Sequence, residues 1–457
     1  MVLIRKPSHK GLQGEPNTNP FHPMQQEETI STAATLGELV RTFGKIGVLS
    51  FGGPAGQIAL MHRMLVEEKG WLDERRFLHA LNFCMLLPGP EAMQLATYSG
   101  WLLRGIPGGL IAGLLFVLPG ALVLTALSAI YVYFGEIPYV EGALFGLKAA
   151  VLAIVVQALV KVSGRALKGS VHYLLALTAL VALMVFSIPF PVVILCAAVT
   201  GAALPAVFAE QTEEAKERQA PISLKGSIAV LSAGLAFWFL PVFVLYQVFG
   251  PGTFFDQAVF FSKAAVVTFG GAYAVLAYVG QQAVEIHHWL MPEEMLAGLG
   301  LAETTPGPLI LVLVFVGFVG AFRDSGGLDP LTGGLLGALI TLWVTFVPCF
   351  IWIFLGAPFM ERLRANPLLA GALAAITAAV TGVMANLAIW FGFHVLFGEV
   401  NRISLGVMSM DLPVPDSVDL AAFAIALLAG LWFWRGGGIL NVLATALAAG
   451  MAVRLLA

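Results

Sequence analysis

Two lysines stand inside apolar segments of this chain, where a positive charge is costly. Lys45 lies about nine residues into one apolar run, and Lys263 lies at the matching depth in another run, 218 residues further on. At 1.5 Å per helical residue, nine residues reach ~14 Å, close to the middle of a bilayer. A lysine at that depth costs at least ~2.5–3.5 kcal/mol and usually faces a functional cavity. Two such ammonium groups, brought together, could bind a small dianion.

Each lysine is followed by the same pair of helix-breaking motifs at the same intervals. Gly52-Gly53-Pro54 and Pro88-Gly89-Pro90 follow the first lysine, and Gly270-Gly271 and Pro306-Gly307-Pro308 follow the second. Glycine permits positive φ and proline removes a hydrogen-bond donor, so the helical ladder should open at each motif. In lipid, an opened backbone is tolerated only inside protein or beside a watery cavity. Half-helices starting after these breaks would present N–H groups and partial positive charge, which are the ingredients of an anion site.

We therefore predict a substrate site at the membrane midplane, formed by these motifs and the two lysines. Backbone N–H groups at 52–54, 89–91, 270–272 and 307–309 would bind the anion. Two alternatives stay open: the motifs could be packing kinks, which membrane helices commonly contain, and the lysines could snorkel to an interface. Seven further side chains could hydrogen-bond in the cavity or join helices to one another: Gln57, Asn82, Gln94, Thr97, Tyr98, Thr304 and Thr305.

Two carboxylates break the symmetry between the copies. Glu91 follows the first Pro-Gly-Pro where the second copy has Leu309, and Glu303 precedes the second where the first copy has Met85. An acid beside an anion site is unfavourable unless it is protonated or paired, so both are candidates for proton coupling. The alternative is an ion pair with a nearby base, or an acid favoured by a helix start.

The apolar segments that would position these residues make up most of the chain. Hydrophobic residues are 59% and charged residues 11%, against about 25% charged in soluble domains. Continuous runs of about 20 residues predict helices rather than a barrel. We expect apolar helices near residues 36–51, 76–104 (broken at 88–90), 108–134, 140–163, 170–188, 190–209, 226–249, 255–270, 294–320 (broken at 306–308), 330–356, 368–390, 418–434 and 437–456. Segments 54–70 and 272–288 are too polar for clear spans and are predicted as re-entrant arms or surface helices.

The lysine and the two helix-breaking motifs recur 218 residues further along the chain. Such recurrence at a fixed interval indicates a duplicated structural unit. Helix 226–249 has no counterpart in the first copy, so it would start the second copy on the opposite side of the membrane. The predicted fold is an all-α polytopic membrane protein with two inverted repeats of about six helices, an extra joining helix, about 13 spans, and broken or re-entrant helices at the centre. The predicted parts are a disordered cytoplasmic tail (1–35), a first transmembrane repeat (36–209), a charged cytoplasmic linker (210–225), the joining helix (226–249) and a second repeat (255–457).

The distribution of basic residues predicts the orientation. Positive-inside bias places 1–35, 161–169, 210–225, 361–364 and Arg435 in the cytoplasm, with the C-terminus outside. The net charge of −3 gives no reason to expect a nucleic-acid partner. No Walker A, H-E-x-x-H or G-x-S-x-G motif appears, and the adjacent His287-His288 cannot share one helix face. We therefore expect a secondary transporter with no metal and no cofactor, not an enzyme. An anion channel is a second hypothesis, and a membrane enzyme or scaffold acting on lipid through Glu91 or His79 is a third.

The motifs at these spacings also resemble those of a known family. FGGP at 51–54, W-L-x-x-x-x-F from Trp71 and the two PGP motifs, taken together, are similar to the chromate ion transporter family in its long two-domain form. The resemblance implies a bacterial inner-membrane protein that exports chromate from the cytoplasm and confers resistance. Sulfate, which is isosteric and also a dianion, is implied as a competing ligand. The second copy departs from the pattern at Ala272, where the first copy has proline. Two consequences stay open: the second break is absent, or the two half-sites are unequal. Association between copies of the chain stays open.

Overall fold

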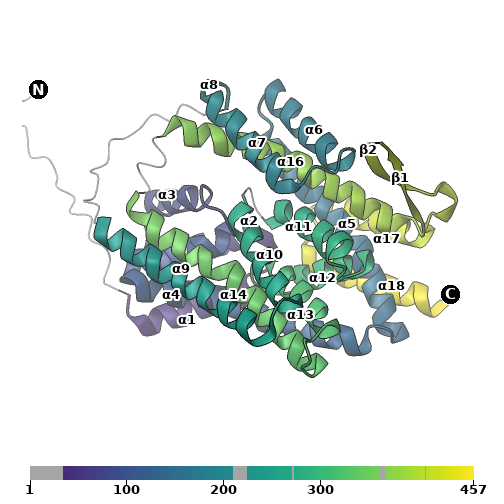
Figure 1. Cartoon of the computed structure of the whole chain (residues 1–457), viewed down its shortest axis with the longest axis horizontal. Helices are drawn as coiled ribbons and strands as arrows, with labels where there is room; N and C mark the ends of the chain where they lie inside the picture. The colour runs from purple at the N-terminus through teal and green to yellow at the C-terminus, as the bar shows by residue number, and fades with distance from the viewer. Residues whose placement is uncertain (1–33, 209–223, 270–271, 360–365, 407, 457) are drawn as a thin grey trace, which may run out of the picture.

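The computed structural model describes residues 34–208, 224–269, 272–359, 366–406 and 408–456, and most of them are helical (Figure 1). Several sequence-based expectations fall outside the described residues. These are nearly all of the N-terminal tail and of the charged linker, the Gly270-Gly271 motif, and Arg362 and Arg364.

The first copy contains nine helical segments. They are α1 (Leu36–Leu49), α2 (Gly53–His62), the π-helix η1 (Arg63–Glu68), α3 (Glu74–Cys84), α4 (Glu91–Phe134), α5 (Pro138–Ala166), α6 (Ser170–Met184), α7 (Phe190–Ala203) and the short α8 (Pro205–Phe208). Helix α9 (Leu224–Phe249) leads into the second copy.

The second copy repeats this order with an insertion near its end. Its elements are α10 (Thr253–Val267), α11 (Ala272–Gln281), the π-helix η2 (Gln282–Ile286), α12 (Pro292–Thr304), η3 (Leu309–Leu311), α13 (Val312–Arg323), α14 (Pro330–Gly356), η4 (Ala357–Phe359), α16 (Pro367–Leu396), β1 (Val400–Leu405), β2 (Met408–Pro413), η5 (Pro415–Ser417), α17 (Leu420–Trp434) and α18 (Ile439–Leu456).

The predicted apolar helices are confirmed to within a few residues at most ends, with three differences. The runs 76–104 and 108–134 are joined in α4, whose helical geometry breaks only at Arg104 and Gly105 (φ −145° and +62°). The run expected at 190–209 ends at Ala203 and restarts as α8. Residues 391–417, which lie between the predicted helices 368–390 and 418–434, hold the end of α16 and an antiparallel hairpin in which Val400 pairs with Pro413.

The backbone repeats along with the sequence. In the first copy the Trp71 N–H donates to the Leu65 carbonyl at 2.9 Å, and at the matching place Trp289 N–H donates to Ala283 at 2.8 Å. Both tryptophans are buried, and both turns end a π-helix that follows a ten-residue α-helix. The duplication seen in the sequence is therefore a duplication of structure.

The C-terminal helices of each copy pack against the other copy. Helix α5 of the first copy contacts α17 and α18, and α16 of the second copy contacts α6 and α7. Glycines make close approach possible, as is common between membrane helices. An added methyl group on Gly450 of α18 would collide with the Gly142 carbonyl of α5, and one on Gly201 of α7 would collide with that of Gly371 of α16. We call α5, α6, α7, α16, α17 and α18 the exchanged helices.

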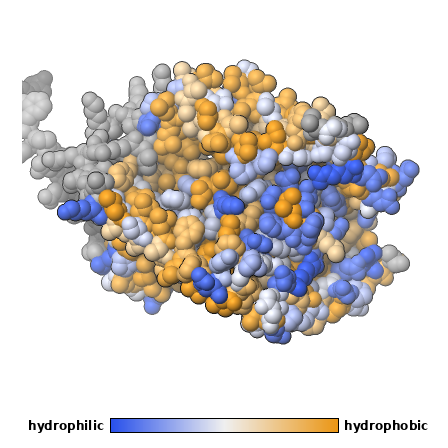
Figure 2. Space-filling model, viewed as in Figure 1, coloured by the Kyte–Doolittle hydropathy of each residue, from blue (hydrophilic) through white to orange (hydrophobic). Residues whose placement is uncertain are grey.

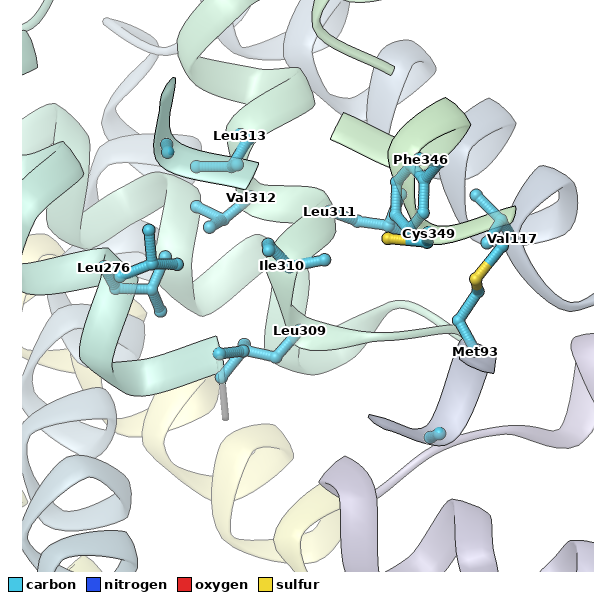
Figure 3. Packing of buried hydrophobic residues seen from close by; sticks show 14 of the residues in the cluster. Met93, Val117, Leu276, Leu309, Ile310, Leu311, Val312, Leu313, Phe346 and Cys349 are labelled. Carbon is cyan, nitrogen blue, oxygen red and sulfur yellow. The ribbon is translucent and has the colours of Figure 1, made fainter. Parts of the chain in front are cut away.

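The other long helices form a second group. Helix α14 contacts α4, α9, α10 and α13, and α1 packs on α4. We call α1, α4, α10, α13 and α14 the motif helices, because they adjoin the repeated breaks. The segment after the second Pro-Gly-Pro lies deep among them. Leu309–Leu313 are at most 4% exposed, and Figure 3 shows Leu311 lying toward Phe346 and Cys349 of α14, with Met93 and Val117 of α4 nearby.

Length and composition support several membrane crossings. In the described part of the chain, six helices are long and apolar enough to cross a membrane: α4, α5, Lys225–Phe249 of α9, α14, α16 and α18. Four shorter helices are also apolar: α6, α7, residues 309–323 and α17. Exposed hydrophobic residues cover much of the surface (Figure 2). The chain is thus a helical, polytopic membrane protein, while the count of 13 spans and the inverted relation of the copies stay predictions.

Candidate functional site

The two Pro-Gly-Pro breaks are each bonded to the opposite copy. The Gly89 N–H donates to the Thr268 carbonyl at 2.8 Å, and the Gly307 N–H donates to the Ser50 carbonyl at 2.8 Å. Ser50 and Thr268 hold equivalent places after α1 and α10, and Gly89 and Gly307 hold equivalent places after α3 and α12. Each bond therefore connects the glycine of one copy to the residue after the first helix of the other copy. A local two-fold relation between the copies would produce this pair of bonds. We call these four residues and their two bonds the crossing.

The residue types at the crossing explain its backbone. Gly89 and Gly307 have φ of +124° and +96°, where a side chain would be strained. The Ser50 hydroxyl donates to the Ile46 carbonyl at 2.7 Å, and the Thr268 hydroxyl donates to Ala264 at 2.6 Å, each within its own helix. Both hydroxyl residues are completely buried. Each hydroxyl thus bonds to a carbonyl of the preceding helix. The backbone carbonyls of Ser50 and Thr268 are left to accept the N–H groups of the other copy.

Two buried glutamines strengthen the same region in the first copy. The Gln57 amide donates to the Gly307 carbonyl at 2.6 Å and more weakly to Ser50 at 3.4 Å, and the Gln94 amide donates to Pro88 at 2.7 Å. Both side chains are at most 1% exposed, and the side-chain oxygen of each accepts no hydrogen bond from the described residues. The matching residues of the second copy, Val275 and Val312, are apolar. The two half-sites are therefore unequal.

Four helices begin at the predicted breaks, and one of them, α11, starts at Ala272 directly after Gly270-Gly271, which lie outside the described residues. Helix α2 starts at Gly53 after Gly52 (φ +86°), α4 starts at Glu91 after Pro90, and η3 starts at Leu309 after Pro308. First-turn N–H groups have no partner within their own helix. The N–H groups of Gly89 and Gly307 already donate within the crossing in this conformation. An anion at this place would therefore meet the N–H groups of the following first turns.

The two lysines lie on equivalent faces of equivalent helices. Lys45 is on α1 and Lys263 is on α10, and both side chains are exposed at the surface of the chain. Val48 beside Lys45 and Val266 beside Lys263 are exposed as well, at 54% and 41%. The lysines therefore do not pack into the protein interior, and their binding of an anion stays a prediction.

The two carboxylates occupy different environments. Glu303, at the end of α12, is 4% exposed, and its carboxylate accepts a hydrogen bond of 2.7 Å from the Tyr273 hydroxyl of α11. Glu91, the first residue of α4, is partly buried. The counterpart of Glu303, Met85, is 62% exposed. The second copy thus buries an acid at a place where the first copy exposes an apolar side chain.

The other polar side chains named from the sequence lie in several different environments. Thr97, Thr304 and Thr305 donate to carbonyls of their own segments, at 3.0, 2.8 and 2.9 Å, whereas Asn82 is exposed. Tyr98 is buried, and its ring stacks on that of Trp101 with 5.6 Å between the ring centroids. Gln57 and Gln94 donate to residues of the breaks themselves, Gly307 and Pro88. Tyr273, the partner of Glu303, was not among the predicted site residues, because nothing in the sequence places it beside an acid 30 positions away.

Comparison with known proteins identifies the family of the chain. The family model described as chromate transporter matches residues 37–202 and 255–453, which are the two copies. The chain is 29% identical to the chromate transport protein of Pseudomonas aeruginosa, covering 93% of each chain. It is 27% identical to a probable chromate transport protein of Synechococcus elongatus (89% of this chain, 97% of that protein) and 28% identical to the chromate transport protein of Cupriavidus metallidurans (77% and 81%). No solved structure matches the chain. With both copies matched and the breaks in place, the chain belongs to the chromate transporter family.

Proposed function

We propose that this chain is a secondary transporter that exports tetrahedral oxyanions, chromate above all, from the cytoplasm, with sulfate as a competing ligand. The crossing supports this proposal most strongly, because paired broken helices at the interface of two repeats are where transporters bind their substrates. Lys45 and Lys263 would supply charge, and the first turns of α2, α4, α11 and η3 would supply N–H groups. Substrate would bind as the copies move relative to each other, giving alternating access.

The same proposal gives the chain an orientation. An inverted pair of repeats in the inner membrane would place the N-terminus in the cytoplasm and the C-terminus outside. The hairpin β1–β2 would then lie on the outer side of this membrane. A two-fold exchange such as the crossing is expected for inverted repeats related by an axis in the membrane plane.

Cellular accumulation tests the direction of transport. Cells that express the chain are expected to hold several-fold less radiolabelled chromate than cells with an empty vector, and added sulfate should reduce this difference. A higher chromate content in the expressing cells would mean import and would contradict the proposed direction.

Glu303 is the stronger of the two candidates for proton coupling. It is buried, it is bonded to the Tyr273 hydroxyl, and it lies three residues before the second Pro-Gly-Pro. We expect Glu303→Gln to abolish uphill accumulation of chromate while exchange of labelled for unlabelled chromate continues, because glutamine keeps a hydrogen-bonding oxygen but releases no proton. Glu293→Gln, at an exposed position of the same helix, is the control. Unchanged uphill accumulation in Glu303→Gln would remove this residue from coupling and leave Glu91 to be tested in the same way.

A further inference from the structure

The two copies differ in how exposed helix α2 and its counterpart α11 are. At each matched position of 54–62 and 272–280 that the structure describes, the residue of α2 is at least as exposed as its counterpart in α11. Ala59, for example, is exposed whereas Ala277 is partly buried, and Leu60 is partly buried whereas Tyr278 is buried. The described conformation is therefore more open beside α2 and more closed beside α11.

An insertion found only in the second copy covers the closed side. Where Leu167–Gly169 join α5 to α6, residues 397–419 join α16 to α17 and form the hairpin. Its base is held together, since the Gly398 N–H donates to the Ser417 carbonyl and the Asp419 N–H donates to the Leu396 carbonyl, both at 2.8 Å. Figure 2 shows hydrophilic residues gathered on the part of this face where Figure 1 draws β1 and β2.

The hairpin is attached to the exchanged helices. The Ser409 N–H donates to the Val185 carbonyl at 2.8 Å, and the hydroxyls of Ser409 and Ser187 lie 2.8 Å apart. Val185 and Ser187 belong to the turn after α6. Since α16 and α17, which carry the hairpin, are themselves exchanged helices, these contacts hold it within a single group.

One ion pair crosses from the hairpin to the segment that follows α11. Arg402 of β1 donates from Nη1 to the Glu285 carboxylate of η2 at 3.0 Å. Asp411 stands opposite Arg402 in the hairpin and is the second acid near it. Both partners of the pair are partly exposed, so the bond is weak enough to break repeatedly.

A pocket lies beside this ion pair, and both partners of the pair line it. About 60 Å³ in volume, it is lined by the end of α6, by α11 and η2, by α16 and by the hairpin, and Gln281, Glu285, Asn386, Arg402, Ser409 and Asp411 contribute its polar surface. Two carboxylates and one guanidinium give this wall a net negative charge. This net negative charge opposes the entry of a dianion from the hairpin side.

We propose that the Glu285–Arg402 pair is the latch of a gate on the hairpin side. Breaking it lets α11 and η2 move away from the hairpin, opens the pocket toward α11, and is accompanied by closure beside α2. This inference rests on the proposed function, because it identifies one gate of the alternating-access cycle. In the proposed orientation it is the outer gate, through which the oxyanion leaves.

Crosslinking tests the latch. In a transport-competent background without Cys84, Cys196 and Cys349, Glu285→Cys and Arg402→Cys are joined by a short, reducible bifunctional thiol reagent. We expect chromate transport to fall more than tenfold on crosslinking and to recover on reduction. The control is a disulfide between Ser187→Cys and Ser409→Cys, which joins parts of one group and should change transport less than twofold. Full transport by the crosslinked Glu285–Arg402 protein would overturn the proposal.

A second readout does not depend on which anion is transported. In the same cysteine-free background, a membrane-impermeant thiol reagent should label Gln281→Cys several-fold faster when Arg402→Gln is added. Exchanging the charges, with Glu285→Arg and Arg402→Glu, should restore slow labelling. Equal labelling with and without Arg402→Gln would overturn the gate, whereas failure of the unlinked protein to transport chromate would contradict only the proposed substrate.

Discussion

Gly89→Ala and Gly307→Ala are each expected to reduce chromate transport by at least about tenfold. Both glycines have positive φ, and a methyl group on Gly89 would meet the Gln94 side-chain nitrogen at 2.8 Å and the Cys349 sulfur at 2.9 Å. Backbone strain alone costs about 1–3 kcal/mol, on the order of a 5- to 150-fold shift in a conformational equilibrium. Because each glycine donates to the other copy, the strain would displace the crossing itself. Initial rates of chromate uptake by vesicles, normalised to folded protein, measure the effect.

Gly327→Ala is the matched control for backbone strain. Gly327 also has positive φ, +88°, but it lies in the loop before α14 and its added methyl group would meet no atom within 4 Å. Transport in this variant should change less than threefold, although its stability falls by a similar amount. Equal losses in Gly327→Ala and in the crossing variants would show that the crossing has no special part in transport.

Lys45→Met and Lys263→Met are each expected to abolish transport, to below about one hundredth of the wild-type rate. A dianion at the membrane midplane loses much of its hydration, so removal of one of two positive charges should be costly. Both side chains are exposed and fill no packed space, so methionine should leave the folded protein intact. Uptake rates and the melting temperature of the purified variants measure the two effects separately.

Lys161→Met is the control for the loss of one positive charge away from the proposed site. Lys161 is an exposed residue near the end of α5, and its loss should leave transport within about twofold of wild type. If Lys45→Met and Lys263→Met both transport like Lys161→Met, the lysines serve only as surface or interface residues, and the anion site would have to rest on backbone N–H groups.

The positions of most helices could be predicted because apolar runs and helix breakers are local signals. Pro330–Gly356 matches the predicted helix at both ends, and Pro88-Gly89-Pro90 and Pro306-Gly307-Pro308 interrupt the helices as expected. The two π-helices could not be predicted, since they depend on one extra residue per turn and carry no composition of their own. The hairpin was missed because its strands are short and follow a helix without a clear turn motif.

The crossing shows where local reasoning ends. The sequence indicates that Gly89 and Gly307 open the backbone, yet the carbonyls that accept their N–H groups belong to residues about 180 and 257 positions away, as their numbers show. Which N–H groups remain available to an anion depends on these long-range bonds. The exposure of Lys45 and Lys263 could not be predicted either, because an apolar run does not show which face of the helix packs against the protein.

Uptake of radiolabelled chromate into energised everted membrane vesicles tests the central claim most directly, that this chain moves chromate uphill out of the cytoplasm. The account predicts accumulation above the concentration in the medium, reduced by excess sulfate and, if protons drive the cycle, abolished by a protonophore. Label that only equalises with the medium would show a channel, and uptake no higher than in vesicles without the protein, with the chain shown to be folded, would contradict chromate as the substrate.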